Sequence, residues 1–194
     1  MIEEHFTALA DSASRASRYA RSIDSWGRHL ATVLESGGRL LACGNGGSAA
    51  EVQHLTGELA GRFLHDRSPY AAIPLHADTS AFTAILNDYG EQEVFARGVR
   101  AHGRPGDVLI ALSTSGRSQN VIAAVKTANE IGMRTWALTG PAPNTLAAVC
   151  DDAVAVQAPS PATVQEMHLA LIHALCAVFD EVAGARQEER SAVR

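Results

Sequence analysis

Apolar residues recur at three- and four-residue spacing along residues 1–36, which is the spacing of an amphipathic helix. The stripe consists of Ile2, Phe6, Leu9, Ala13, Ala16, Ala20, Ile23, Trp26, Leu30 and Val33. Asp24 and Ser25 interrupt it, so the pattern predicts either one long kinked helix or two helices. Gly37 and Gly38 end the segment, as glycines commonly do after a helix. So long an apolar stripe must either pack on a sheet or meet another subunit.

From residue 39 onward the pattern changes to short apolar runs that do not alternate with polar residues. Such runs are typical of strands buried on both faces of a parallel sheet. The predicted strands are residues 39–43, 70–75, 107–112, 134–138 and 153–156. Helical patterns end at about Leu64 and Ile131, and a last helix is expected over about 162–182. The sequence therefore predicts an α/β fold: a three-layer αβα sandwich with a central parallel sheet, flavodoxin-like or Rossmann-like, preceded by N-terminal helices.

The whole chain, residues 1–194, is predicted to form a single domain. At 20.4 kDa it should bury roughly 70% of its unfolded surface, enough for a core without disulfides or metals. Residues 1–36 are the N-terminal helical segment, used in packing or oligomerisation. Residues 37–184 form the α/β core, and residues 185–194 are a polar tail expected to fray.

Composition excludes several classes of protein. With 16 Lys and Arg against 21 Asp and Glu, the net charge is −5, so the chain is not a generally basic nucleic-acid binder. No apolar run approaches the ~20 residues that span a bilayer, and the acidic N-terminal segment does not resemble a signal peptide. Three cysteines without a CxxC motif make neither a disulfide framework nor a zinc knuckle. We therefore expect a cytoplasmic protein with reduced thiols and no nucleic-acid or membrane partner.

Four hydroxyl side chains follow the predicted strand 107–112 within six residues. They are Ser113, Thr114, Ser115 and Ser118, with Gly116 among them to allow close backbone approach. Ligands of open parallel sheets bind at the carboxyl ends of the strands. The free N–H groups, positive helix end and hydroxyl donors of this loop suit a phosphate. Serine is also favoured as a helix N-cap, but four hydroxyls around a glycine favour anion binding.

A glycine-rich loop, Gly44 to Ser48, follows the first predicted strand. It formally matches the G-x-G-x-x-A pattern of dinucleotide-binding proteins, but the next strand runs into His76 where that pattern needs an acidic residue for the ribose. The chain also has no Walker A motif and no G-x-S-x-G elbow. We expect the glycines to let the backbone turn tightly beside a smaller ligand, with Asn45 and Ser48 presenting polar groups.

A second group of candidate residues is ionisable. His54 and Glu58 lie four residues apart and share a helix face, while Gln165 and His173 lie eight apart on the last helix. The four could form a nitrogen–oxygen metal site or an acid–base pair; the alternatives are a solvated helix contact and a satisfied core histidine. Eight residues of helix rise about 12 Å, long for two ligands of one ion, unless the helix bends or a neighbouring subunit contributes. His168 points away and is expected to be structural or interfacial.

Six ordered motifs resemble those of the phosphoheptose isomerases in the sugar isomerase (SIS) superfamily. They are CGNGGSAAEVQH, ELAGRF, AILNDYG, ALSTSGRSQNV, ALTG and VQEMHLALIH, within about residues 37–174. The resemblance implies isomerisation of D-sedoheptulose 7-phosphate to D-glycero-D-manno-heptose 7-phosphate, the entry step to nucleotide-activated heptose. It also implies a homotetramer with active sites at subunit interfaces, and one Zn2+ ion per subunit.

The resemblance further implies roles for individual residues. Its metal positions fall on His54, Glu58, Gln165 and His173, and its catalytic positions on Glu58 and His173. Its substrate contacts fall on Asn45, Gly46, Gly47, Ser48, Glu58, Asn87, Asp88, Ser113, Thr114, Ser115, Ser118 and Gln165. Arg62 matches an arginine near the site. Arg117 and the PAPN segment at 141–144 depart from the family pattern, and neither departure removes a catalytic group.

The implied chemistry suits these side chains. Aldose–ketose isomerisation moves a proton between C1 and C2 through an enediol, which needs a base, an acid and stabilisation of the developing oxyanion. We hypothesise that Glu58 removes the carbon-bound proton, that His173 handles the oxygen-bound proton, and that a metal polarises the carbonyl. Glu58 cannot be both a firm metal ligand and a free base throughout, and the sequence leaves both roles open. The serine loop would anchor the phosphate and thereby orient the reacting end.

Three rival functions are weighed against this one. Some SIS proteins are non-catalytic scaffolds, including one that binds a replication initiator, but they lack the acid–base set that this chain keeps. A sugar-phosphate-sensing regulator would carry a DNA-binding helix-turn-helix, and none accompanies this domain. An isomerase of another ketose phosphate, of five to seven carbons, would differ only in loop residues.

Overall fold

A five-stranded parallel sheet forms the centre of the computed structural model, which describes residues 1–192, with side chains through residue 184. The strand order is β2-β1-β3-β4-β5, and every neighbouring pair is parallel. The strands are β1 (Leu40–Gly44), β2 (Ala72–Pro74), β3 (Val108–Ser113), β4 (Arg134–Thr139) and β5 (Asp152–Ala155). This order is that of flavodoxin-like doubly wound sheets, so the predicted α/β sandwich is confirmed.

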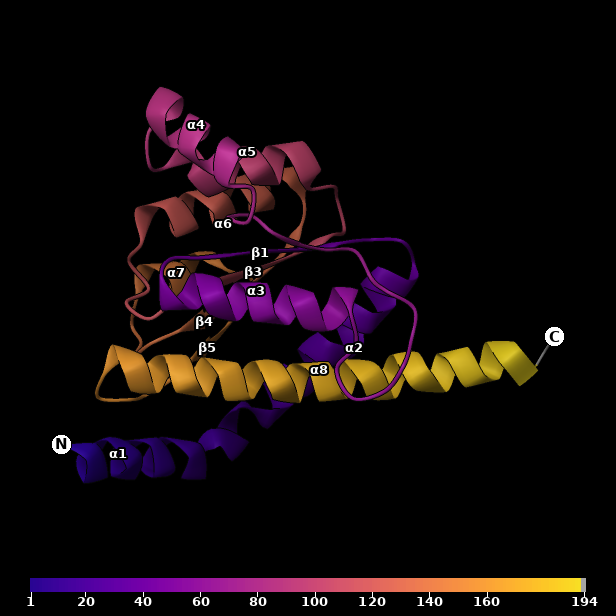
Figure 1. Ribbon diagram of the computed structural model, residues 1–194, viewed down its shortest axis with the longest axis horizontal. Coiled ribbons are helices and arrows are strands. Elements are labelled where there is room, and N and C mark those ends of the chain that lie inside the picture. Colours follow the sequence, from indigo (N-terminus) through magenta and orange to yellow (C-terminus); the bar gives the residue numbers. More distant parts are fainter. Residues whose placement is uncertain (193–194) are drawn as a thin grey trace.

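Helices cover both faces of the sheet (Figure 1). The layer with the N-terminal and C-terminal helices contains α2 (Ala20–Glu35), α3 (Gly47–Ala60) and α8 (Pro161–Ala192). The opposite layer contains α5 (Glu93–His102), α6 (Gln119–Ile131) and α7 (Thr145–Val149), with α4 (Thr79–Tyr89) packed on α5. The first helix, α1 (Ile2–Ser14), is joined to α2 by a 3-10 turn, η1 (Ala16–Tyr19), and projects beyond the body of the molecule in Figure 1.

The central strands bury both of their faces, which explains why their sequences do not alternate. In β3, Val108, Ile110 and Leu112 point to the α2–α3–α8 layer. Leu109 and Ala111 point to the α5–α6–α7 layer, and all five side chains are buried. Successive side chains of a strand face opposite sides of the sheet, so a strand between two helical layers must be apolar throughout.

The N-terminal helical segment breaks earlier than the sequence pattern predicts. Helix α1 ends at Ser14 and η1 follows, whereas Asp24 and Ser25 lie inside the continuous helix α2. The predicted break at these two residues is therefore wrong. The Asp24 carboxylate accepts a hydrogen bond at 3.0 Å from Arg28 Nε, one helical turn along the exposed face, so a polar residue there supports the helix.

Two other predicted helix ends also differ from the structure. Helix α3 ends at Ala60 instead of near Leu64, because Gly61 leaves the helical conformation with φ −93° and ψ −116°. Helix α8 continues to Ala192, well past the predicted end near residue 182. The polar tail at 185–194 is expected to fray, but its residues 185–192 continue α8, and residues 193–194 lie outside the part of the chain that the structure describes.

The C-terminal helix is long and apolar enough to be compared with a membrane span. The segment Pro161–Gly184 contains an 18-residue window with a mean hydropathy of 1.4, of which 44% is buried inside the protein. Its apolar residues pack against the sheet and against α2, α3 and α1. The length and apolar composition of α8 are therefore explained by its place in the core. They are weak evidence for a membrane segment.

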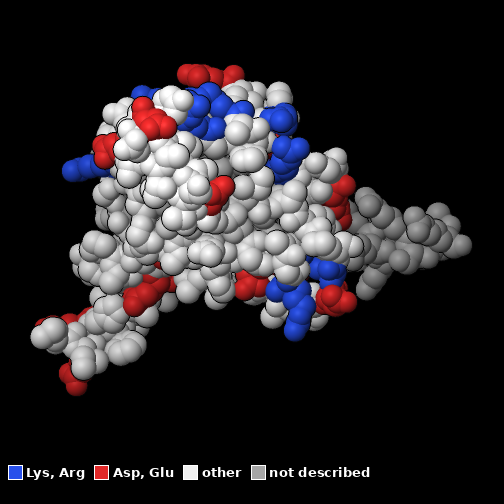
Figure 2. All heavy atoms as spheres, turned by 45° about the horizontal axis from the view of Figure 1, so that its top comes forward, with Lys and Arg blue, Asp and Glu red and all other residues white. Residues whose placement is uncertain are grey.

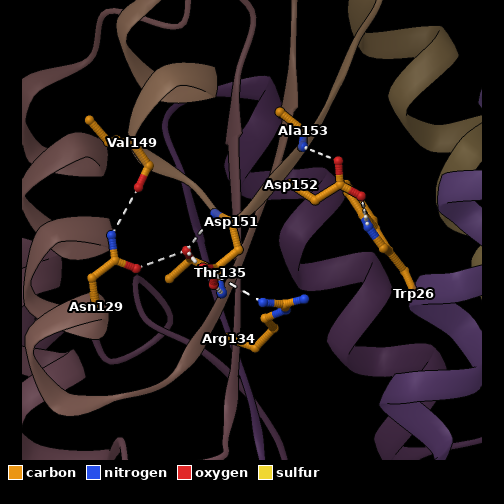
Figure 3. Close-up of polar contacts among 8 residues, drawn as sticks. All are labelled: Trp26, Asn129, Arg134, Thr135, Val149, Asp151, Asp152 and Ala153. Atoms are coloured by element: carbon orange, nitrogen blue, oxygen red, sulfur yellow. Dashed lines mark hydrogen bonds and ion pairs between the residues drawn. The ribbon is translucent and has the colours of Figure 1, made fainter.

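Side chains fasten the amino ends of β4 and β5 (Figure 3). Asp151 Oδ2 accepts a hydrogen bond from the Thr135 backbone N–H at 2.8 Å. Asp152 Oδ2 accepts one from Trp26 Nε1 at 2.8 Å, and the Trp26 ring stacks on Trp136 with centroids 5.1 Å apart. These contacts anchor α2 to this edge of the sheet, while the opposite, carboxyl edge carries the loops with candidate chemistry.

Asp107 holds the amino ends of two strands, and its loss should destabilise the fold. Its carboxylate oxygens accept hydrogen bonds from the backbone N–H groups of Arg39 and Arg104, each at 2.9 Å, and the residue is buried. Asp107→Ala leaves two donors unpaired and is expected to lower the free energy of unfolding by about 2–4 kcal/mol, measured with urea. Asp66→Ala, on an exposed aspartate, should change it by less than about 0.5 kcal/mol. Equal effects of the two substitutions would contradict this account of Asp107.

Candidate functional site

The two loops singled out by sequence lie side by side at the carboxyl edge of the sheet. β1 and β3 are neighbours, with Gly44 opposite Leu112, and the strand order reverses direction between them. The glycine-rich loop follows β1 and the serine-rich loop follows β3. Ligands of open α/β sheets bind at such a switch point, so the fold places both loops where a ligand is expected.

The glycine-rich loop makes close backbone approaches that a side chain would prevent. Gly46 adopts φ 57° and ψ −122°, a backbone conformation that favours glycine. A Cβ on Gly44 would lie 2.9 Å from the Ser48 carbonyl oxygen, and a Cβ on Gly47 would lie 2.5 Å from Gln165 Nε2. The loop thus turns tightly, as predicted, and its last glycine lets the Gln165 side chain of α8 reach the start of α3.

The hydroxyl groups of the serine loop converge on one another. Ser113 Oγ lies 3.1 Å from Ser118 Oγ and 3.5 Å from Ser115 Oγ, and it accepts a hydrogen bond from the Gly116 N–H at 3.2 Å. Ser118 is the N-cap residue of α6, but its side chain makes no capping hydrogen bond. Its hydroxyl faces the loop instead, so N-capping does not account for it and the arrangement suits an anion.

Residues 140–144, which follow β4, pack against the serine loop. Gly116 has φ 61°, and a Cβ there would lie 2.2 Å from Asn144 Cγ. Asn144 belongs to the segment that departs from the family pattern; its Nδ2 donates to Thr139 Oγ1 at 3.0 Å, and its Oδ1 caps α7. A Cβ on Gly140 would lie 2.0 Å from the Thr114 carbonyl oxygen. The departure at 141–144 therefore contributes a residue, Asn144, that packs against the serine loop.

A reciprocal amide pair joins the two loops, and sequence reasoning missed one member of it. Asn45 Nδ2 donates to Asn120 Oδ1 at 2.9 Å, and Asn120 Nδ2 donates to Asn45 Oδ1 at 3.0 Å. Asn120 lies at the second position of α6, directly after the serine loop. The one sequence signal for Asn120 is a polar amide directly after the serine loop. Its partner Asn45 lies 75 residues away, and no local pattern connects the two.

Helices α3 and α8 bring the ionisable candidates together. His54 Nε2 lies 2.9 Å from His173 Nε2 and 3.2 Å from Glu58 Oε1. The His54 side chain is 42% exposed and that of Glu58 is 19% exposed. The His173 ring stacks on Phe63, with centroids 5.7 Å apart. A carboxylate and two imidazoles within hydrogen-bond reach, open to solvent, can exchange protons with a bound molecule.

Gln165 does not join this cluster. It lies beside Gly47 at the start of α3, whereas His173 meets His54 farther along the same helix. Helices α3 and α8 run in the same direction (Figure 1). Gln165 and His173, eight residues apart on α8, therefore lie beside different parts of α3. Over residues with described side chains, no group of three or more His, Cys, Asp or Glu is arranged to hold a metal ion.

The cluster also lies at a distance from the serine loop of its own chain. Helix α3 starts at the carboxyl edge of the sheet with Gly47 and runs back along it. At about 1.5 Å per residue, His54 is about 10 Å and Glu58 about 16 Å along this helix. His54, Glu58 and Arg62 line an open surface hollow of about 540 Å³, with Arg62 Nη1 donating to the Leu64 carbonyl at 3.4 Å.

Asn87 and Asp88 stand apart from both loops. They lie in the last turn of α4, where Asn87 Nδ2 donates to Asp88 Oδ1 at 2.8 Å, and both are exposed. α4 packs mainly on α5. Their described hydrogen bond is to each other and not to either loop.

Basic side chains gather near the α4–α5 end of the molecule with acidic ones among them (Figure 2). Arg97 lies over the Tyr89 ring at 3.8 Å, and Arg100 pairs with Glu93. These two guanidinium groups are therefore engaged in contacts within the chain.

His168 is structural, one of the two roles expected for it. Its side chain is fully buried, and Nε2 lies 3.1 Å from the Thr139 carbonyl oxygen, which it can contact as a donor. Nδ1 lies 3.7 Å from Glu51 Oε2 on α3. The residue links α8 to β4 from inside the core.

All three cysteines are free thiols, and burial should make them unreactive. Burial raises the pKa of Cys43 well above its ordinary value. Burial, reinforced by nearby carboxylates, raises the pKa of Cys150 and of Cys176 to about 12. Because the thiolate is the reactive form, the folded protein should react with Ellman's reagent at pH 8 about 100-fold more slowly than the urea-unfolded chain. Rapid labelling of the folded protein would contradict these environments.

The switch-point fold, with an anion loop and an acid–base cluster, defines a domain that binds and transforms a small phosphorylated molecule. The SIS domain family matches residues 4–140. A phosphoheptose isomerase of Streptomyces coelicolor is 60% identical over 172 residues, covering 89% of this chain and 74% of that protein. One of Thiobacillus denitrificans is 47% identical, covering 93% and 94%. The solved phosphoheptose isomerase of Neisseria gonorrhoeae is 42% identical with a TM-score of 0.86, covering 93% and 97%. The chain belongs to the phosphoheptose isomerase family of SIS domain proteins.

Proposed function

We propose that this protein is an isomerase that converts D-sedoheptulose 7-phosphate to D-glycero-D-manno-heptose 7-phosphate through an enediol, the first step toward nucleotide-activated heptose. The observation that carries the proposal is the contact of His54 Nε2 with both His173 and Glu58, at 2.9 and 3.2 Å. This acid–base set separates an enzyme from a non-catalytic SIS scaffold. Identities of 60% and 47% to phosphoheptose isomerases support the choice of substrate.

Glu58 and His173 divide the proton transfers between carbon and oxygen. The Glu58 carboxylate removes a proton from C1 of the ketose and, after exchange with solvent, delivers a proton to C2. His173 gives a proton to the C2 oxygen and accepts one from the C1 oxygen, so neither residue is changed after a turnover. His54, in contact with both side chains, holds them at the same reacting atoms.

The donor atoms of the cluster also suit a zinc ion. Imidazole nitrogens and carboxylate oxygens are ligands that zinc prefers. The proposed ligands are His54, Glu58 and His173, which meet within one chain, and Gln165, which lies beside Gly47 and would join them only from a neighbouring subunit. When bound, the ion would supply Lewis-acid polarisation of the carbonyl. A carboxylate has two oxygens, so Glu58 could hold the ion through one and present the other to substrate. Elemental analysis of the purified protein, before and after chelation, tests for one zinc per chain.

The serine loop binds the phosphate, far from the carbon atoms that react. Ser113, Ser115 and Ser118 supply hydroxyl donors, with Thr114 and the amino end of α6 beside them. Asn45, Gly46, Gly47 and Ser48 bind the sugar from the neighbouring loop, and Gln165 reaches the same edge. Fixing the phosphate orients the other end of the sugar for proton transfer.

The complete site requires a homotetramer with active sites at subunit interfaces. Three features support this proposal: the separation of Glu58 from the serine loop along α3, the isolated position of Asn87 and Asp88, and the apolar surface of the N-terminal helices. Ile2 and Phe6 on the projecting helix α1 are 76% and 62% exposed. An apolar groove of about 360 Å³ lies between α2 and α8. Light scattering should give four times the chain mass of 20.4 kDa, and a monomeric mass would refute the assembly.

The experiment that tests the activity is a turnover assay with the purified protein and sedoheptulose 7-phosphate, with added zinc and after chelation. Formation of the heptose 7-phosphate is expected, and its loss on chelation would include the metal in the reaction. Binding of the sugar phosphate without turnover would instead favour a scaffold or a different substrate. We place the reaction in the cytoplasm, in keeping with the three free thiols.

A further inference from the structure

Arg67, in the loop between α3 and β2, is a buried cation that the proposed chemistry does not use. Its side chain is 5% exposed, and that of its partner Asp180 on α8 is 6% exposed. Arg67 Nε donates to Asp180 Oδ1 at 2.7 Å. A buried guanidinium is costly unless its donors are satisfied, so its remaining contacts indicate what it holds in place.

The other donors of Arg67 cap the end of α3. Nη2 donates to the Glu58 carbonyl oxygen at 2.7 Å, and Nη1 donates to the Leu59 carbonyl oxygen at 2.9 Å. The last carbonyls of a helix have no partner within the helix, and a cation there also complements the helix dipole. The guanidinium therefore fixes the backbone of the residue whose side chain is the proposed base.

Asp180 connects the same guanidinium to the helix of His173. Seven residues separate Asp180 from His173, which is nearly two helical turns and places both side chains on one face of α8. Tyr70 and Phe179 lie on the guanidinium, each with its ring centroid 5.3 Å from Arg67 Cζ. A planar cation that stacks on aromatic rings while its separate nitrogens donate to several acceptors is specific to arginine.

The electrostatics around Cys176 agree with this arrangement. Burial first, and then the charges of Glu58 and Asp180, raise the pKa of the Cys176 thiol to about 12, while Arg67 acts in the opposite direction. The thiol thus lies within the influence of all three charged groups, between the end of α3 and α8.

We propose that Arg67 is a positioning residue, which clamps the Glu58 backbone on α3 to Asp180 on α8 and thereby holds Glu58 in register with His173. The inference rests on the proposed isomerase function. The clamp does not touch the serine loop, which follows a different strand, so its loss should affect proton transfer more than phosphate binding.

The test compares three variants with the wild-type protein. Arg67→Met removes every donor, and Arg67→Lys keeps a charge beside Asp180 but cannot span both carbonyls. Arg28→Met is the matched control, because Arg28 also pairs with an aspartate, Asp24, but on the exposed surface. kcat and KM for sedoheptulose 7-phosphate are measured well below each variant's unfolding temperature, per folded molecule.

Arg67→Met should lower kcat about 10–100-fold, with KM changed less than about threefold, since a misplaced base costs rate and not phosphate binding. The kcat of Arg67→Lys should lie between that of Arg67→Met and that of the wild type. Arg28→Met should have the kcat and KM of the wild type. If Arg67→Met does not fold, the same comparison of kcat with KM in Arg67→Lys tests the proposal. An unchanged kcat per folded molecule, or a rise in KM alone, would overturn the proposal.

A second readout separates this inference from the proposed function. The imidazole NMR signals of His54 and His173 report their mutual geometry without any turnover. Arg67→Lys should shift both, and Arg28→Met neither. A wild-type protein inactive on the sugar phosphate would refute the isomerase function. The imidazole signals would still test the clamp, because they do not depend on turnover. Unchanged imidazole signals in Arg67→Lys would refute the clamp.

Discussion

Glu58→Gln is expected to lower kcat about 10³-fold while KM for sedoheptulose 7-phosphate changes little. A general base typically contributes 10²–10⁴-fold to rate, and an amide cannot accept the carbon-bound proton. The substitution keeps the size of the side chain and its contact with His54 Nε2, so the fold should persist. The measurement is steady-state kinetics, with circular dichroism to show that the variant is folded.

Glu130→Gln is the matched control for this experiment. Glu130 lies on the exposed side of α6, so the same chemical change there should leave kcat and KM as they are. Retention of substantial activity by Glu58→Gln would exclude Glu58 as the base. Loss of activity in both variants would show that the assay responds to charge in general and not to this carboxylate.

The second large effect is expected from Gly116→Ala in the serine loop. Gly116 has φ 61°, and the added Cβ would lie 2.2 Å from Asn144 Cγ and 2.6 Å from Asn144 Cβ. Both the backbone strain and the clash oppose the native loop; a left-handed non-glycine residue alone costs about 1–3 kcal/mol. The loop must therefore shift, and kcat/KM should fall about 100-fold, mainly through KM, with a loss of about 2 kcal/mol in unfolding free energy.

Gly184→Ala provides the control for the glycine substitution. Gly184 lies within α8, and its Cβ would have open space around it. Alanine is favoured over glycine in a helix by about 1 kcal/mol, so this variant should be slightly stabilised with unchanged kinetics. If Gly116→Ala kept the wild-type KM, the serine loop would not be the phosphate site.

The sheet and its two ligand loops could be predicted because their signals are local. Each central strand is apolar throughout, since it is covered on both faces, and a loop rich in glycine or serine follows β1 and β3. The polar pair Asp24 and Ser25 predicts a helix break, but the break lies earlier, between Ser14 and Ala20. The structure shows that Arg28, the partner of Asp24, lies one turn away on the exposed face.

The parts of the site that escaped prediction depend on contacts between distant residues. Asn120 pairs with Asn45 across the two loops, and Arg67 pairs with Asp180 across two helices. Neither partner is indicated by spacing. The motif resemblance placed Gln165 with the histidines, whereas the parallel course of α3 and α8 sets it beside Gly47. Asn87 and Asp88 lie on α4, away from the segments that follow β1 and β3 in the chain, and their place in a site stays a prediction.

The most direct test of the central claim is proton NMR of sedoheptulose 7-phosphate incubated with the protein in D2O. Enediol chemistry at Glu58 predicts an aldose 7-phosphate product that carries solvent deuterium at C2, formed by the wild type and not by Glu58→Gln. A product whose C2 hydrogen comes entirely from C1 of the ketose, with no solvent deuterium, or no product from a protein that still binds the sugar phosphate, would contradict the account.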